Sequence, residues 1–439
     1  MKTKKIVFFG CLITMFAMTC NFVKPVKAES STINARLIIS SSLDTDVLKN
    51  ELESDINGIN LNVIEQYDSG MVLAELKGNG KLDNVIQKIE SEKGVEFVQE
   101  DYSLHSIDTI DTMIPSDSYF AYQWGLHNYG QYLGEKGVEG VDINILPAWE
   151  LTEGSPDVII GVLDTGIDIT HEDLVNSIYT NSKEIAGNGI DDDGNGYIDD
   201  VNGWDFCYND NSVFDNPIED LHGTFVSGII AAEKNTLGIC GTAPNVKILP
   251  IKFIPGDNGK TSDAIKAIDY ASKMGVDIIN CSWGGPDYNK ALKKAMKHSG
   301  ILFVCSSGNE GYNVDTQKMY PACFNINNII TVGAIDNKGD WAPFSNYGTD
   351  VDVAAPGVNI MSTLPFNSYS IGSGTSFAAP YVTGIAALIK SVKINSTYKE
   401  IKKAIVKHTV TDERLIDKVN TSGRVDAYAS IKYVIDKMN

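Results

Sequence analysis

Three short stretches decide the fold: Val162-Leu163-Asp164-Thr165-Gly166-Ile167-Asp168, His222-Gly223-Thr224, and Gly374-Thr375-Ser376-Phe377-Ala378-Ala379-Pro380. They hold, in chain order, one acid, one imidazole and one hydroxyl in small-residue frames: Asp164, His222 and Ser376. A serine hydroxyl is a poor nucleophile at neutral pH unless a neutral imidazole takes its proton and a buried carboxylate orients that imidazole. The stretches therefore predict that Ser376 attacks, that His222 acts as base and that Asp164 orients His222.

The sequence around each side chain predicts where it stands in the fold. The apolar run 158–163 is typical of a strand buried on both faces of a parallel sheet, and Asp164 ends it, where ligands gather in such sheets. His222 opens a small-residue helix that reaches Ala232, and Ser376 opens another over Phe377 to Lys390. A hydroxyl at a helix start lies beside free N–H groups that favour developing negative charge.

A fourth stretch follows the predicted strand Ile301 to Cys305 and reads Ser306-Ser307-Gly308-Asn309-Glu310-Gly311. An amide side chain held there can donate to a tetrahedral oxyanion, and one such donor contributes about 3–4 kcal/mol of transition-state stabilisation. Taken singly, each stretch is a common turn or helix start. Their joint order and placement favour catalysis.

These residues and frames resemble the subtilisin-like serine proteases (subtilases) over about residues 115–435, with a matching region before them. The resemblance implies a parallel α/β sheet flanked by helices, and an oxyanion hole made by Asn309 with the N–H of Ser376. It also implies that the segment after strand 276–281 pairs with the substrate backbone as an added strand. The substrate-binding residues expected by resemblance are Ser282, Trp283, Gly284, Ser306, Ser307, Gly308 and Met319.

Three positions depart from the subtilase pattern. Phe225 stands where many relatives have a second histidine, and Phe377 replaces the methionine that often follows the nucleophile. Met319 falls where a small residue often forms the floor of the S1 pocket, which leaves the depth of S1 open. Glu310 is expected at the pocket rim, where it either favours a basic P1 residue or is merely solvated.

Composition and charge narrow the class of protein. Of the 439 residues, 43% are hydrophobic and 21% are charged, as in globular proteins, and the chain is long enough for two or three domains. The formal net charge of −21 argues against nucleic acid or an anionic membrane as partner. This negative charge suits a soluble protein that binds cations. The alternative is that the acidic residues only aid solubility.

The N-terminal 28 residues predict a signal peptide and hence secretion. Lys2, Lys4 and Lys5 precede the apolar stretch Ile6 to Cys20, and small residues flank Lys27 at the cleavage position. An uncleaved anchor is the alternative, but this stretch is shorter than the ~20 residues that a membrane span needs.

Residues 29–105 predict a propeptide, followed by a linker over 106–118 and the catalytic domain over 119–439. Strands at 36–40, 61–66, 71–76 and 95–99 with helices at 44–56 and 81–92 give the ferredoxin-like order. The resemblance implies that this unit templates folding and then inhibits the active site, with self-processing near the linker. An independent small domain is the alternative. We expect a monomer whose partners are polypeptide substrates and its own propeptide.

Two calcium sites are predicted. The loop 191–200 places oxygen ligands at the alternate positions of an EF-hand-type loop, although Asn202 stands where the bidentate Glu belongs, and a solvated acidic turn is the alternative. Its candidate ligands are Asp191, Asp193, Asn195 and Asp199. A second site is implied only by the resemblance, at Asp117, Asp173 and Asn235.

The cysteines do not predict a disulfide framework or a zinc site. Five remain after removal of the signal peptide: Cys207, Cys240, Cys281, Cys305 and Cys323. Cys281 and Cys305 end predicted strands and are expected as packed thiols, with a single disulfide left open.

The sequence therefore predicts a secreted, calcium-stabilised serine endopeptidase of the subtilase type. Enzymes that remove leader peptides from lantibiotic-like peptides share this size and architecture, and the residues do not separate them from general proteases. The rival class is a catalytically inactive peptide-binding protein on the same scaffold.

Overall fold

The computed structural model of the chain describes residues 32–42, 47, 59–67, 70–101, 114–256 and 258–438. The chain divides into two compact units, Met1–Ile107 and Asp108–Asn439, which are treated separately. The predicted signal peptide and most of the predicted linker lie outside the described residues. No described helix has the length and apolar character that crossing a membrane requires.

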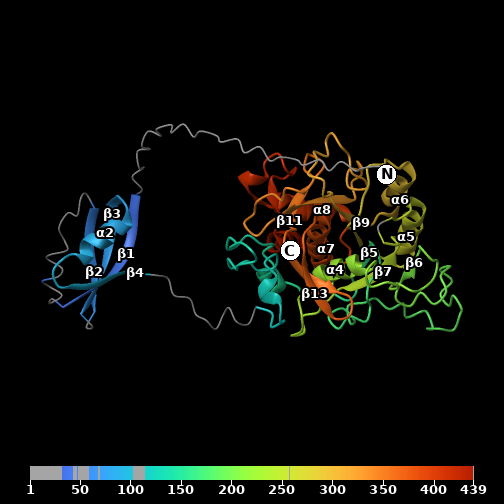
Figure 1. Cartoon of the computed structure of the whole chain (residues 1–439), viewed down its shortest axis with the longest axis horizontal. Helices are drawn as coiled ribbons and strands as arrows, with labels where there is room; N and C mark the ends of the chain where they lie inside the picture. Colours follow the sequence, from blue (N-terminus) through green and yellow to red (C-terminus); the bar gives the residue numbers. More distant parts are fainter. Residues whose placement is uncertain are drawn as a thin grey trace, which may run out of the picture. The chain divides into compact units, whose positions relative to one another are not determined.

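The first unit is a four-stranded antiparallel sheet with a helix packed on it (Figure 1). Its elements are β1 (Thr32–Ser41), β2 (Ile59–Tyr67), β3 (Met71–Asn79), α2 (Leu82–Glu90) and β4 (Val95–Glu100), and its strand order is β2-β3-β1-β4. Every second residue at the start of β2 is buried, and α2 covers these side chains with Val85 and Ile89. The predicted strands fall within β1 to β4. The predicted helix at 44–56 lies outside the described residues apart from Val47.

The second unit is built on a nine-stranded sheet whose order is β14-β15-β11-β10-β9-β8-β5-β7-β6 (Figure 1). All of its strand pairs are parallel except β14 with β15. The strands are β5 (Ile159–Asp164), β6 (Trp204–Asp205), β7 (Lys247–Lys252), β8 (Ile278–Cys281), β9 (Leu302–Ser306), β10 (Ile329–Ile335), β11 (Val353–Pro356), β14 (Val410–Thr411) and β15 (Gly423–Arg424). The central strands are buried on both faces, which explains their continuous apolar sequences.

Helices cover both faces of this sheet, so two hydrophobic cores form. One core contains side chains of α3 (Leu146–Trp149), α4 (Leu221–Ala231), α7 (Thr375–Val392), α8 (Tyr398–Lys407) and α9 (Ala427–Met438). The other core contains side chains of α5 (Thr261–Lys273) and α6 (Lys290–Ser299). Two short helical turns, η2 (Phe120–Tyr122) and η3 (Glu413–Leu415), and the hairpin β12 (Ile360–Leu364) with β13 (Ser368–Gly372) complete the unit.

The predicted α/β architecture, a mainly parallel sheet flanked by helices, is confirmed. The boundaries differ slightly: α7 begins at Thr375, so Ser376 lies inside its first turn rather than before it. Among the described residues all five cysteines are free, and Cys281 and Cys305 are buried neighbours in register on β8 and β9.

Candidate active site

Asp164 and His222 are brought together at the carboxyl edge of the sheet. Asp164 ends β5 and is 1% exposed, and His222 Nδ1 lies 2.8 Å from Asp164 Oδ1. The start of α4 is held against the loop after β5, because the N–H of Gly223 donates to Thr165 Oγ1 at 3.1 Å. A Cβ at Gly223 would stand 2.2 Å from the carbonyl oxygen of Gly166, so only glycine permits this approach.

The surroundings of His222 favour its protonated form. Burial lowers the pKa of His222, but the charge of Asp164 and the hydrogen bond to it outweigh burial, so the pKa lies above its ordinary value. The His222 side chain is 29% exposed. The ring is therefore fixed on its Asp164 side and accessible to a substrate.

Ser376 is coupled to the end of β8 by two reciprocal hydrogen bonds. Its hydroxyl donates to the carbonyl oxygen of Ser282 at 3.1 Å, and the Ser282 hydroxyl donates to the carbonyl oxygen of Ser376 at 2.7 Å. Asn280 Nδ2 donates to the same Ser282 hydroxyl at 2.9 Å. The predicted substrate-pairing segment, which begins at Ser282, is thus anchored directly to the first turn of α7.

The amide of Asn309 is oriented by Thr375. Asn309 Oδ1 accepts hydrogen bonds from the Thr375 N–H at 2.8 Å and from Thr375 Oγ1 at 2.9 Å, which leaves Nδ2 as a donor. A Cβ built on Gly374 would lie 3.6 Å from Asn309 Nδ2 and 3.8 Å from the Ser376 nitrogen. Asn309 Nδ2 and the Ser376 nitrogen therefore both lie near this position, with the Phe377 ring also 3.8 Å from it, where the sequence predicts the oxyanion hole.

Met319 lies between the two segments predicted to bind substrate. Its side chain comes within 3.3 Å of a Cβ built on Gly284 and within 3.2 Å of one built on Gly308. Met319 therefore fills space between these segments, where the resemblance implies the floor of the S1 pocket. Ser306 and Ser307 are buried, and the Ser307 hydroxyl donates to the Asn346 carbonyl oxygen, so the hydroxyl of Ser307 serves the fold.

Comparison with known proteins decides the family, since the model of the subtilase family, Peptidase S8, matches residues 155–427. The chain belongs to the subtilase family. A thermophilic serine proteinase of Bacillus sp. (strain AK1) is 34% identical over 81% of this chain and 77% of that protein. The major intracellular serine protease of Bacillus subtilis (strain 168) is 37% identical over 61% of this chain and 79% of that protein.

A solved structure of a protease from Pseudoalteromonas arctica PAMC 21717 matches with a TM-score of 0.59 and 28% identity, covering 73% of this chain and 99% of that chain. Family membership and these relatives make the chain a serine-type endopeptidase with a subtilisin-like fold. Both the predicted class of enzyme and the predicted fold are confirmed.

Two phenylalanines distinguish this subtilase next to the nucleophile. The Phe225 and Phe377 rings pack with centroids 4.2 Å apart, and the Phe377 ring lies 5.8 Å from that of His222. A Cβ at Gly372 would stand 2.6 Å from Phe377, so the end of β13 closes over this ring. Two of the three departures noted in the sequence, Phe225 and Phe377, therefore form one packed aromatic unit beside His222.

We expect activity to survive a peroxide exposure that inactivates a Phe377→Met variant. A methionine next to Ser376 would gain a polar oxygen beside the oxyanion position, whereas phenylalanine has no sulfur to oxidise. Residual activity against peroxide dose measures the effect, with Met319→Ala as a companion variant. Equal loss in wild type and Phe377→Met would contradict the prediction, and protection by Met319→Ala alone would place the sensitive sulfur in the S1 pocket.

The sequence analysis missed a buried ionic network beside the predicted triad. Lys252 ends β7 next to Asp164 and is 2% exposed, with Nζ 2.5 Å from Asp215, 3.1 Å from Asp220 and 3.6 Å from Asp205. Burial lowers the pKa of Lys252, but the contacts with Asp215 and Asp220 outweigh burial. The pKa therefore lies above its ordinary value, and the ammonium stays charged. Because Asp220 directly precedes α4, this network fixes the start of the helix that carries His222. The sequence feature that could have indicated this network is a lysine at the end of an apolar strand.

Asn346 was also missed. It is fully buried, and its Nδ2 donates to the Ser307 carbonyl oxygen at 3.0 Å and to Glu310 Oε2 at 2.7 Å. Its Oδ1 accepts from the Tyr312 N–H at 2.7 Å. Asn346 therefore holds the loop that presents Asn309, and it engages the carboxylate of Glu310.

The carboxylates of the acidic loop group differently from the predicted ligand set. Those of Asp191 and Asp199 accept hydrogen bonds from backbone N–H groups of residues 188–196 and lie outside the cluster of three acidic side chains that the structure forms. Asp193 instead gathers with Glu184 and Asp200, whose oxygens lie within 4.8 Å of one another. Asn195 contacts this group by donating Nδ2 to Asp200 at 3.0 Å. Three acidic groups, of which Glu184 and Asp200 are buried, form an oxygen donor set that fits a hard divalent cation.

The structure also brings together the three residues implied for the second calcium site. Asn235 Nδ2 donates to Asp173 Oδ1 at 3.2 Å, and the Asn235 N–H donates to Asp117 Oδ1 at 3.0 Å. Asp117 Oδ2 is buried without a hydrogen-bond partner. Burial raises the pKa of Asp173 to about 7, with a smaller contribution from the charge of Asp117. A buried carboxylate pair with an unpartnered oxygen fits a cation.

Proposed function

We propose that this subtilase is a secreted, calcium-stabilised endopeptidase, made as a zymogen, that cleaves peptide bonds with Asp164, His222 and Ser376. The observation that carries the proposal is the convergence at one sheet edge of the 2.8 Å contact between His222 and Asp164 with the donors of Asn309 and Ser376. A binding protein on the same scaffold would have no use for an oriented base beside two oxyanion donors.

In the proposed reaction, the Ser376 hydroxyl turns from the Ser282 carbonyl to His222 Nε2 and gives up its proton as Oγ attacks the substrate carbonyl carbon. The carbonyl oxygen becomes an oxyanion that accepts hydrogen bonds from Asn309 Nδ2 and the Ser376 N–H. His222 then passes the proton to the leaving amine, and the acyl group stays on Oγ. A water, deprotonated by His222, releases the acyl group as a carboxylic acid.

The segment beginning at Ser282 supports the proposed mode of substrate binding. A polypeptide lying along it would pair backbone to backbone as an added strand. A cavity of about 390 Å³ adjoins this segment, and its lining mixes apolar side chains with polar ones: Phe253, Trp283, Leu292, Asn258, Lys260, Asp287 and Asn289 among others. In this proposal the cavity receives a side chain of the substrate, and Met319 limits the depth of the P1 pocket.

A fluorophosphonate probe tests the proposal directly. The reagent phosphonylates a serine only where a base and oxyanion donors activate it. We expect mass spectrometry of the labelled protein to place the adduct on Ser376. A catalytically inactive peptide-binding protein would remain unlabelled at this residue.

The pH dependence of kcat/KM should show the raised pKa of His222. The base must be neutral to accept the Ser376 proton, and the charge of Asp164 stabilises the protonated form. Activity should therefore fall with acidification, with an apparent pKa above the ordinary histidine value of about 6.5. The Asp164→Asn variant should lower the rate, and it should also shift the acidic limb of the pH profile, where kcat/KM falls, to lower pH. An apparent pKa below about 6.5 for the wild-type enzyme would contradict the assignment of His222 as the base.

Chelation is expected to lower the melting temperature and to speed autolysis. An ion that binds only the folded state contributes RT ln(1 + [L]/Kd), about 2.7 kcal/mol at 100 times Kd. Glu184→Gln combined with Asp193→Asn should remove much of the difference in melting temperature between calcium and chelator. Asp173→Asn is the matched variant at the second site. If the double variant keeps the full difference and Asp173→Asn loses it, the stabilising ion binds at the second site.

Removal of leader peptides from exported lantibiotic-like peptides is a narrower hypothesis within this function. Met319 at the expected S1 floor and Glu310, which both lie close to Gly308, are the features that bear on it. Peptide-library profiling distinguishes the cases, because a leader peptidase should require a defined sequence before the cleaved bond and a general protease should accept many.

A further inference from the structure

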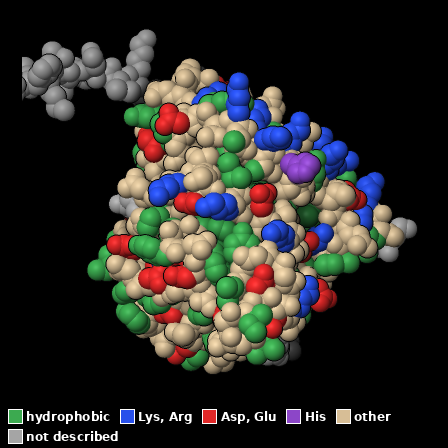
Figure 2. All heavy atoms as spheres, turned by 90° about the vertical axis from the view of Figure 1, so that its right-hand side faces the viewer, with side chains coloured by type: hydrophobic (Ala, Val, Ile, Leu, Met, Phe, Trp, Pro, Cys, Tyr) green, Lys and Arg blue, Asp and Glu red, His purple; other side chains and the backbone are tan. Residues whose placement is uncertain are grey.

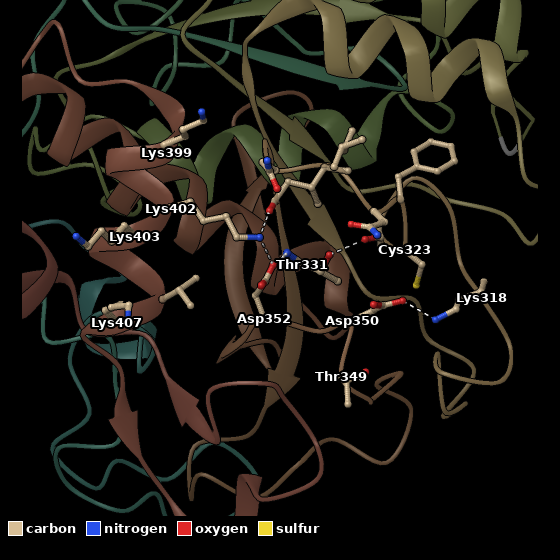
Figure 3. A pocket seen from close by; sticks show the side chains of 17 residues that line it. Lys318, Cys323, Thr331, Thr349, Asp350, Asp352, Lys399, Lys402, Lys403 and Lys407 are labelled. Atoms are coloured by element: carbon tan, nitrogen blue, oxygen red, sulfur yellow. Dashed lines mark hydrogen bonds and ion pairs between the residues drawn. The ribbon is translucent and has the colours of Figure 1, made fainter.

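A cavity of about 710 Å³ opens between α8 and the segment 322–331 that leads into β10 (Figure 3). It lies at the amino ends of β10 and β11, whereas Asp164 and Ser306 stand at the carboxyl ends of their strands. The cavity is therefore outside the substrate-binding region described above.

The wall of this cavity is strongly basic although the whole chain carries a formal net charge of −21. Five lysines and two aspartates line it, with Lys399, Lys402, Lys403 and Lys407 following α8 along one side (Figure 3). Two lysines are neutralised: Lys318 lies 2.5 Å from Asp350, and Lys402 lies 3.0 Å from Asp352.

Three lysines remain without a counter-charge. Within residues 114–256 and 258–438, no carboxylate forms an ion pair with Lys399, Lys403 or Lys407, and all three are exposed. They stand four residues apart, so they follow one face of α8 and repel one another there. Lys399 is also in the first turn, at the positive end of the helix. Lys407, in the last turn, is favoured by the negative end of the helix, and Lys399 Nζ lies 5.9 Å from the centre of the Tyr398 ring. No described carboxylate neutralises the three ammonium groups, and a bound anion would do so.

The opposite wall adds neutral hydrogen-bond donors. Asn325 and Asn327 belong to the segment facing α8, and their exposed amides make no hydrogen bond within the described second unit. The aspartates of the cavity are already paired with lysines, so they present little free negative charge. Ammonium groups on one side and amides on the other are the donors that a phosphate oxyanion prefers.

We propose that this cavity binds a multiply charged phosphate oxyanion, with Lys399, Lys403 and Lys407 as the cationic wall and Asn325 and Asn327 as neutral donors. Lysines four residues apart on a helix are separated by about 6 Å along its axis. The stripe therefore suits a short chain of linked phosphates better than a single compact ion. The free anion and the end of a phosphate polymer share this chemistry.

Titration with inorganic tripolyphosphate at constant ionic strength tests the site. We use the full chain with Ser376→Ala, so that autolysis does not interfere. We expect saturable binding by calorimetry and a rise in melting temperature. The triple substitution Lys399→Gln, Lys403→Gln and Lys407→Gln should weaken binding at least tenfold.

Helix α6 supplies a matched control, because its sequence is also rich in lysine and its face of the molecule shows gathered basic side chains (Figure 2). Lys290→Gln with Lys294→Gln and Lys297→Gln removes the same charge from exposed positions and should leave the affinity unchanged. Equal weakening by both triple variants would show general electrostatic attraction and would overturn the proposal, as would the absence of saturable binding.

Stability without the anion separates binding from a structural role. The α8 variant should unfold at the same temperature as its parent or slightly above it, because the substitutions relieve repulsion between lysines. A lowered melting temperature would show that these lysines serve the fold and would overturn the proposal.

A parallel titration with long-chain polyphosphate identifies the source of the phosphate. If one polymer chain binds more tightly than one tripolyphosphate ion, the site takes the end of a polymer, and if the two bind equally, it takes the free anion.

Discussion

Replacing Ser376 by alanine is expected to abolish peptide hydrolysis and to leave the precursor unprocessed. The variant lacks the oxygen that forms the acyl-enzyme, whereas Asp164, His222 and the oxyanion donors remain. In subtilisin, a member of this family, loss of the nucleophile lowers kcat by a factor on the order of 10⁶. The residual rate over water would come from the oxyanion donors and from substrate binding.

Processing is expected to fail in the same variant, because the cleavage that releases the propeptide is proposed to be intramolecular. Mass spectrometry of purified Ser376→Ala should find the residues that precede the linker still attached. Ser373→Ala is the control, since its exposed hydroxyl accepts the Asn359 N–H and has no role in the proposed reaction. Maturation of purified Ser376→Ala by itself, with hydrolysis at the wild-type rate, would refute the triad.

Sequence pattern alone predicted the strand and the two helices that carry the proposed triad, for a local reason. The apolar run before Asp164 and the small residues after His222 and Ser376 are marks of one strand and two helices, and β5, α4 and α7 begin or end within two residues of those marks. In a parallel sheet the carboxyl ends of strands share one edge, so local assignments sufficed to predict this edge as the site, where Asp164 and His222 lie 2.8 Å apart.

What sequence could not supply depends on contacts between distant segments. The hydroxyl of Ser376 donates to a carbonyl 94 residues away. Lys252 meets Asp205 of the neighbouring strand β6 and two aspartates of the segment that follows it, which no local pattern connects to Lys252. The acidic loop 191–200 shows the same limit. Alternation along the loop suggested Asp191 and Asp199, whereas the cluster of acidic side chains in the structure contains Glu184, which comes from outside the loop.

The oxyanion donor is expected to have the second largest effect. Asn309→Leu should lower kcat by about 10²–10³ with little change in KM, because the hydrogen bond forms mainly in the transition state. This magnitude is the one known for the equivalent loss in subtilisin. Leucine also leaves the buried Thr375 N–H and hydroxyl without their acceptor, so this variant alone would mix a catalytic effect with a structural one.

Asn309→Asp separates the two effects. Aspartate keeps an oxygen for Thr375 but replaces the Nδ2 donor by a second acceptor, and its negative charge opposes the developing oxyanion. We therefore expect Asn309→Asp to keep the wild-type melting temperature and to lose at least as much kcat as Asn309→Leu. Stopped assays over a range of substrate concentrations give kcat and KM for both variants. An unchanged kcat with a raised KM in Asn309→Asp would show that Asn309 binds the substrate without stabilising the transition state. The open position beside Gly374 would then hold the ground-state carbonyl rather than the oxyanion.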